Sequence, residues 1–203
     1  MNLENLPINW FDFVVLIVIL LGASRGRKHG MSVEMMISLQ WVAIIFAGAF
    51  LYRPVGDWLS DISPMSHLFC YITVYVVTAM VVKSSFSLVK KSTGGKLVGS
   101  DVFGRAEFYL GMVAGAVRFT CILIAALALL NARLYTSREV AGAKAFQVDM
   151  YGSTFFTELS DVQQMVFKTS LLGSAVKNYA GFLLIAPTAP EQKGIQRGKD
   201  SLP

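Results

Sequence analysis

Four long apolar stretches, separated by short connections, constrain most strongly what this chain can fold into. They occupy residues 10–24, 31–52, 67–82 and 107–131 of the 203-residue sequence. A helix rises about 1.5 Å per residue, so the second and fourth stretches can each cross a hydrocarbon core of about 30 Å. The pattern predicts an all-α, polytopic membrane protein with about four transmembrane helices.

Composition favours the membrane fold over a soluble helical bundle. Hydrophobic residues make up 54% of the chain and charged residues 15%, whereas soluble domains carry about 25% charged residues. The apolar residues are also concentrated in blocks, whereas a soluble core helix would repeat them at its own period. We therefore expect the lipid bilayer to be the main environment of this chain.

The first stretch resembles a signal peptide in length but not in charge order. A signal peptide carries basic residues before its apolar region and a small-residue cleavage site after it. Here Glu4 precedes the stretch, and Arg25, Arg27 and Lys28 follow it. The charge order is reversed, so we expect an uncleaved first span.

The lysine and arginine residues of the connections predict the orientation. Residues 25–30 hold three and residues 83–105 hold five, whereas residues 53–66 hold one. Connections rich in these residues stay in the cytoplasm. Both termini are then extracytoplasmic, in a multi-pass protein of the bacterial inner membrane.

Three segments follow from this pattern: a transmembrane domain over 9–131, an extracytoplasmic tail over 132–186, and a disordered end over 187–203. In the tail, Ser160 is expected to cap a short amphipathic helix. The stretch 174–186 ends in apolar residues but is too short to span. It is expected to lie on the membrane surface or to pack against a partner.

Arg118 is the most informative single residue, because it lies well inside the fourth stretch. A charge near mid-bilayer costs at least about 2.5 kcal/mol, so Arg118 should face a protein partner or water. The alternative is a helix that starts near Val117, with Arg118 reaching the cytoplasmic interface.

Four further residues are candidates for roles inside the membrane. Gly111 and Gly115 have the spacing that lets two helix backbones approach closely. Glu34, early in the second stretch, is the nearer candidate partner for Arg118, although it could instead serve the helix start, where a carboxylate is favoured. Asp12, near the start of the first stretch, is a third charge expected within the membrane.

Enzyme signatures are not apparent, and we expect neither catalysis nor a cofactor. His29 and His67 are predicted on opposite faces of the membrane, so they cannot share a metal. The run 92–97 contains two glycines and a lysine but lacks phosphate-loop spacing. The net charge of +5 lies in the connections rather than on a folded face, so nucleic-acid binding is not expected.

The order and spacing of several short motifs resemble the colicin V production protein family, whose members are small bacterial inner-membrane proteins. The resemblance covers about residues 9–131 and does not extend into the tail. Its motifs are Trp10-Phe11-Asp12, then Gly30 with Glu34 and Trp41, then Gly99-Ser100-Asp101, and last Gly111, Gly115 and Arg118.

The resemblance implies a role in producing or exporting a peptide toxin, or more generally in envelope homeostasis. Two modes of action remain open. The chain could be an accessory protein that binds other membrane proteins, or it could be a homo-oligomeric channel or transporter subunit in which the fourth span lines the path.

Overall fold

The computed structural model describes residues 9–97, 104–151 and 159–189. Their regular elements are helices, with one isolated β-bridge between Arg133 and Thr188. The elements are α1 (Trp10–His29), α2 (Met31–Ile62), α3 (His67–Leu97), η2 (Gly104–Ala106), α4 (Glu107–Asn131), α5 (Ser137–Tyr151), α6 (Leu159–Gln164), the π-helical turn η3 (Met165–Thr169), α7 (Leu171–Tyr179) and η4 (Gly181–Leu183).

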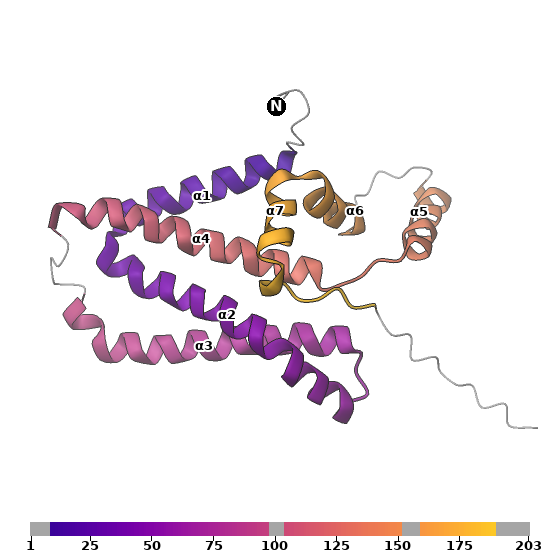
Figure 1. Cartoon of the computed structure of the whole chain (residues 1–203), viewed down its shortest axis with the longest axis horizontal. Coiled ribbons are helices and arrows are strands. Elements are labelled where there is room, and N and C mark those ends of the chain that lie inside the picture. Colours follow the sequence, from indigo (N-terminus) through magenta and orange to yellow (C-terminus); the bar gives the residue numbers. More distant parts are fainter. Residues whose placement is uncertain (1–8, 98–103, 152–158, 190–203) are drawn as a thin grey trace, which may run out of the picture.

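The four long helices run lengthwise beside one another and form the body of the molecule (Figure 1). Helix α4 packs against α1 on one side and against α2 on the other, and α3 packs against α2. The short helices α6 and α7 gather at the end of the bundle where α4 finishes. The predicted all-α membrane fold is confirmed.

Local chemistry sets the boundaries of α1. The Asn9 side chain accepts a hydrogen bond from the helix start, and the Asp12 carboxylate accepts one from the Asn9 amide, which together form a capping box. At the other end Gly30 has a φ of 75°, a conformation that glycine adopts readily. The chain therefore leaves α1 and enters α2 with a single residue between them.

The number of candidate spans differs from the prediction. Helices α2, α3 and α4 are long and apolar enough to cross a membrane, whereas α1 does not meet that test. The apolar part of α1 ends where Arg25, Arg27 and Lys28 begin. Residues 10–24 rise only about 22 Å, less than a hydrocarbon core of about 30 Å.

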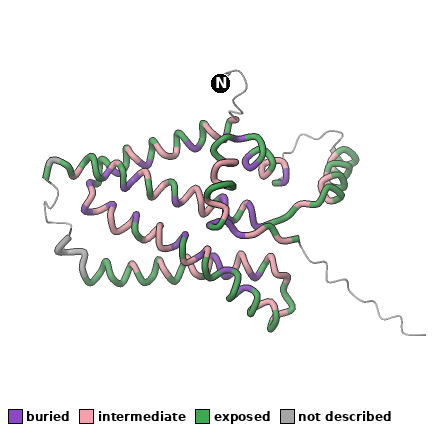
Figure 2. Tube along the Cα trace, viewed as in Figure 1, coloured by how far each residue is buried: buried purple, intermediate pink, exposed green. Residues whose placement is uncertain are grey.

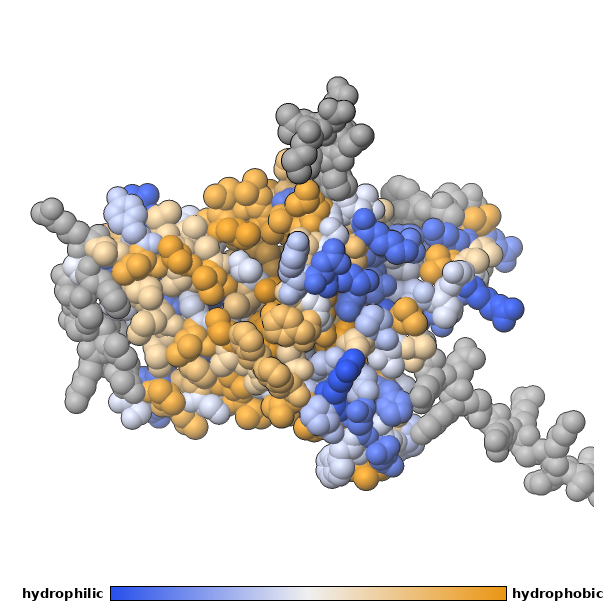
Figure 3. Space-filling view, in the orientation of Figure 1, coloured by the Kyte–Doolittle hydropathy of each residue, from blue (hydrophilic) through white to orange (hydrophobic). Residues whose placement is uncertain are grey.

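The outward faces of the long helices are apolar, as a lipid environment requires. Phe13 and Leu20 on α1 and Met80 on α3 are each about 60% exposed, and exposed positions run along the outer sides of the bundle (Figure 2). On the face drawn in Figure 3, hydrophobic residues cover the long helices and hydrophilic residues gather over the tail.

The tail packs onto the end of the bundle. Val166, Phe167 and Ile185 are buried in the same core cluster as Phe11 and Leu127 of the long helices. The Asn131 side chain donates a hydrogen bond to the Ile185 carbonyl at 2.9 Å. The segment 174–186 therefore covers the bundle's own α2 and α4 ends.

Two details of the tail differ from the expected pattern. Ser160 lies inside α6, which begins at Leu159, so it is not the residue that precedes the helix. Thr188, in the segment expected to be disordered, donates its backbone N–H to the Ala132 carbonyl at 2.9 Å. The remainder of that prediction, residues 190–203, lies outside the described residues.

Candidate functional site

A seam of glycines joins α1 to α4. Gly22 and Gly26 on α1 lie against Gly115 and Gly111 on α4. A Cβ added at Gly22 would lie 2.8 Å from the Gly115 carbonyl oxygen, and one added at Gly111 would lie 2.5 Å from the Gly26 carbonyl oxygen. The two backbones are in direct contact, so no larger residue fits without moving a helix.

Sequence reasoning selected Gly111 and Gly115 for close packing but did not identify their partner. The structure places α1 opposite them, through two glycines with the same four-residue spacing. That spacing in Gly22 and Gly26 was a usable signal. Gly26 lies between Arg25 and Arg27, outside the apolar run, so the pair does not stand out as a packing motif within a span.

Arg118 and Glu34 form an ion pair between α4 and α2. The Arg118 Nη1 lies 3.3 Å from Glu34 Oε1 and 3.2 Å from Oε2. The arginine side chain is 20% exposed and the glutamate side chain 1%. Helix α4 begins at Glu107, well before Val117. Arg118 is thus paired with a protein carboxylate inside the bundle, as the cost of an unpaired membrane charge requires.

The pair sits in a small polar layer near the α1–α2 turn. The His29 ring lies 3.6 Å from the Glu34 carboxylate. The Ser38 hydroxyl donates to the Ala114 carbonyl at 2.7 Å, and the Ser32 amide donates to Glu107 at 2.9 Å. These two hydrogen bonds join α2 to α4 near Arg118. They therefore help to hold the Arg118–Glu34 pair in place.

Asp12 is not part of this polar layer, and its carboxylate contacts the C-terminal tail. Its carboxylate accepts hydrogen bonds from the Ser170 hydroxyl at 2.7 Å and from the Leu172 amide at 2.9 Å, at the start of α7. Asp12 therefore ties the N-terminal end of α1 to the tail.

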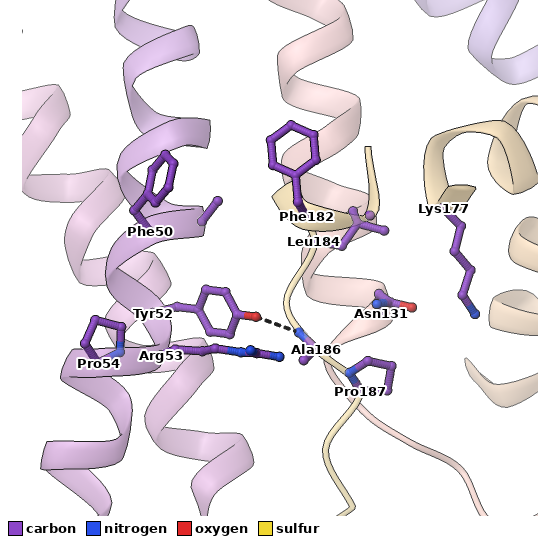
Figure 4. A pocket seen from close by; sticks show the side chains of 12 residues that line it. Phe50, Tyr52, Arg53, Pro54, Asn131, Lys177, Phe182, Leu184, Ala186 and Pro187 are labelled. Carbon is purple, nitrogen blue, oxygen red and sulfur yellow. Dashed lines mark hydrogen bonds between the residues drawn. The ribbon is translucent and has the colours of Figure 1, made fainter. Parts of the chain in front are cut away.

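A pocket opens at the tail end of the bundle, between α2, the end of α4 and the returning tail (Figure 4). Its volume is about 610 Å³, within the range of ligand-binding clefts. The Ala186 amide of the returning tail donates a hydrogen bond to the Tyr52 hydroxyl of α2 at 3.1 Å, and this bond joins two sides of the pocket. The lining consists of Ala49, Phe50, Tyr52, Arg53, Pro54, Asn131, Lys177, Gly181, Phe182, Leu184, Ala186 and Pro187.

The charges of this pocket are all positive. Arg53 reaches across from α2 and Lys177 lies on α7, while aromatic rings of Phe50 and Phe182 stand on the same side of the opening (Figure 4). No acidic side chain lines the pocket. An anionic group with an apolar neighbour would match this lining, because arginine and lysine donate charge-assisted hydrogen bonds to carboxylates and phosphates.

Sequence reasoning missed the pocket. Arg53 was noted only as the single basic residue of its connection, and Lys177 carried no signal. The pocket exists because the tail returns to α2, which depends on contacts between residues far apart in the sequence. Over the described ranges no three side chains are grouped as metal ligands would be.

Comparison with models of known protein families identifies the family of this chain. The family model of the colicin V production protein matches residues 11–159. The match extends through α5 to the start of α6, so the likeness does not stop at residue 131 as the motifs alone indicated. No curated protein and no solved structure matches the chain. This membrane-type, all-α chain belongs to the colicin V production protein family.

Proposed function

We propose that the protein is a non-enzymatic accessory protein of the bacterial inner membrane that acts by binding another membrane or envelope protein. Its role, as the family implies, is in the production or export of a peptide toxin or in envelope homeostasis. The observation that carries the proposal is the 610 Å³ pocket at the tail end, with Arg53 and Lys177 on its lining.

The pocket's lining indicates what kind of segment it would bind. Aromatic rings and two cations around one opening favour a peptide segment that combines an apolar side chain with a carboxylate. Neither cation forms an ion pair with an acidic side chain among the salt bridges of the described chain. Their described contacts are with aromatic rings, Arg53 with Tyr52 and Lys177 with Phe167, so neither charge is neutralised by these contacts.

The channel alternative receives less support from the packing. A path lined by the small residues of α4 needs Gly111 and Gly115 to face it. In the fold these glycines contact α1 of the same chain. We therefore favour partner binding over a pore along this face.

We also propose that both termini are extracytoplasmic. The basic residues of the α1–α2 turn and the C-terminal half of α3 lie at one end of the bundle, and α6 and α7 lie at the other (Figure 1). Asp12 binds the start of α7, so the start of α1 and the helices α6 and α7 share one side. Helix α1 must then traverse the bilayer region despite its short apolar part.

Single-cysteine labelling tests this orientation. In a background with Cys70 and Cys121 replaced by alanine, Ser63→Cys is expected to react with an impermeant maleimide on intact spheroplasts. Ser92→Cys should react only after the membrane is opened, because it follows the basic residues Lys90 and Lys91. The reverse pattern would invert the proposed topology.

Site-specific photo-crosslinking tests the pocket. A photoreactive phenylalanine at Phe182, in the pocket, should give a discrete protein adduct in the native membrane. The same probe at Phe146 on α5, which is similarly exposed, should give none. The Arg53→Glu, Lys177→Glu variant should lower the adduct yield at least about tenfold, because each charged hydrogen bond contributes about 1.5–3 kcal/mol.

The matched control is Arg138→Glu, an exposed charge reversal outside the pocket, which should leave the adduct unchanged. An adduct of equal yield at Phe182 and Phe146, or one indifferent to the double reversal, would refute the pocket as the binding site. An adduct with a second copy of the chain, together with conductance in a planar bilayer, would favour the channel alternative.

A further inference from the structure

A second cavity lies within the body of the bundle, between α3 and α4. Both helices pack against α2, but within the described residues they make at most marginal contact with each other. The space between them has a volume of about 420 Å³ and α2 forms its floor. We call this space the α3–α4 groove. The tail takes no part in its lining, so it is distinct from the pocket of Figure 4.

The groove is apolar along its length and cationic at one end. Ile44, Val76 and Leu129 belong to its apolar lining, and Lys83 and Arg118 are the only charged residues that line it. Glu34, which pairs with Arg118, is not part of the lining. The charges of Arg118 and Glu34 cancel, so Lys83 leaves one net positive charge at this end of the groove.

Two buried donors in the groove lack partners within the described chain. The Tyr75 hydroxyl has no hydrogen bond, although the residue is only 3% exposed. The Arg118 Nε is buried and also has no partner. A buried polar group without a hydrogen bond costs about 1–3 kcal/mol, so a small shift of side chains that brought an acceptor in the groove to either atom would remove that cost.

The length of the groove limits what can occupy it. Along α4 it extends from Arg118 to Leu129, which is about 16 Å of helix. That is about half of a hydrocarbon core of about 30 Å. Lys83 directly follows the apolar run of α3, so the cationic end coincides with the edge of that run. A transmembrane helix would need the full thickness, whereas a single lipid needs one leaflet.

We propose that the α3–α4 groove binds one anionic phospholipid from the leaflet at the basic end of the bundle. Lys83 and Arg118 Nε hold the phosphate, the Tyr75 hydroxyl donates to an ester carbonyl, and one acyl chain lies along the apolar wall. The proposal does not depend on the partner pocket, and the two can fail separately.

Native mass spectrometry of the full chain tests it. The detergent-solubilised protein is offered phosphatidylglycerol or phosphatidylcholine with identical acyl chains, and the bound fraction is measured over a concentration series. The wild type should retain one phosphatidylglycerol and prefer it over phosphatidylcholine. Inorganic phosphate at millimolar concentration should not displace it, because it lacks the acyl chains.

Four variants separate the groove from general surface charge. Lys83→Gln should weaken phosphatidylglycerol binding about fivefold, the effect of one basic residue at a membrane surface. Lys90→Gln, an exposed lysine on the same helix outside the groove, should change nothing. Ala125→Phe fills the groove without removing a charge and should abolish retention, and Tyr75→Phe, which removes only the hydroxyl, should weaken it in a protein that keeps its fold.

Several outcomes would overturn the proposal. Equal retention of both lipids would mean that the groove does not recognise charge. Equal losses in Lys83→Gln and Lys90→Gln would assign the preference to the surface as a whole. Undiminished binding in Tyr75→Phe together with Ala125→Phe would place the lipid elsewhere, and a dimer that excludes lipid and dissociates on Lys83→Gln would assign the groove to a second copy.

Discussion

Replacing Gly26 by leucine is expected to separate α1 from α4 and to cause a large loss of stability. A side chain at this position would meet the Gly111 carbonyl group and the Gly115 backbone, neither of which can rotate away. Overpacking typically costs about 1–3 kcal/mol, and a clash with backbone on both neighbours belongs at or above the top of that range. The midpoint of thermal unfolding in detergent should fall accordingly.

Gly142→Leu is the matched control, because nothing lies within 4 Å of the Cβ that it adds on α5. Leucine is also a better helix former than glycine by about 0.8–1 kcal/mol, so this variant should be as stable as the wild type or more stable. The double variant Gly111→Leu, Gly115→Leu should reproduce the loss from the other side of the seam. Normal melting in either seam variant would show that α1 does not lie against α4.

The seam and the ion pair also show what a single sequence reveals about a membrane protein. Gly111, Gly115 and Arg118 stood out because a bilayer makes a bare charge expensive and leaves helices only close packing to hold them together. These are local rules that act on single residues and on four-residue spacings, so they can be read without a structure.

Other features depend on contacts that no local rule contains. The prediction that Asp12 is a charge within the membrane did not include its contact with the tail, where its carboxylate accepts hydrogen bonds from Ser170 and Leu172 at the start of α7. The Asp12–Leu172 contact joins residues 160 positions apart. The pocket around Arg53 and Lys177 likewise appears only once the tail has returned to α2. The first stretch was predicted to be a span like the others, but its apolar part is shorter, and only α2, α3 and α4 are long and apolar enough by themselves.

The ion pair gives the second prediction, which is a double-mutant cycle. Arg118→Leu leaves the Glu34 carboxylate buried without its cation, and Glu34→Leu leaves the guanidinium in the same state. Removing one partner of a buried pair costs about 3–5 kcal/mol. Both single variants should therefore melt well below the wild type. The sequence alone predicts a different effect on stability, because there Arg118→Leu simply removes a charge that is costly in the membrane.

The double variant Arg118→Leu, Glu34→Leu should recover most of that loss, because replacing a buried pair by apolar residues is often neutral or stabilising by about 1–4 kcal/mol. Arg118→Lys should fall between, since lysine keeps the charge but lacks the further donors and the planar shape of the guanidinium. Two single variants whose losses simply add in the double variant would show that the residues do not interact.

The cycle also separates a structural role from a functional one, because stability and activity need not recover together. If the pair only joins α2 to α4, the double variant should complement a deletion strain as well as the wild type does. We expect a stable double variant that fails to complement, because a charge that apolar residues could replace without loss of stability is retained for another reason. We assign that reason to lipid binding in the α3–α4 groove, because Arg118 lines the groove and its buried Nε has no partner. Full complementation by a stable double variant would show that Arg118 and Glu34 only join α2 to α4 and that apolar residues can replace them.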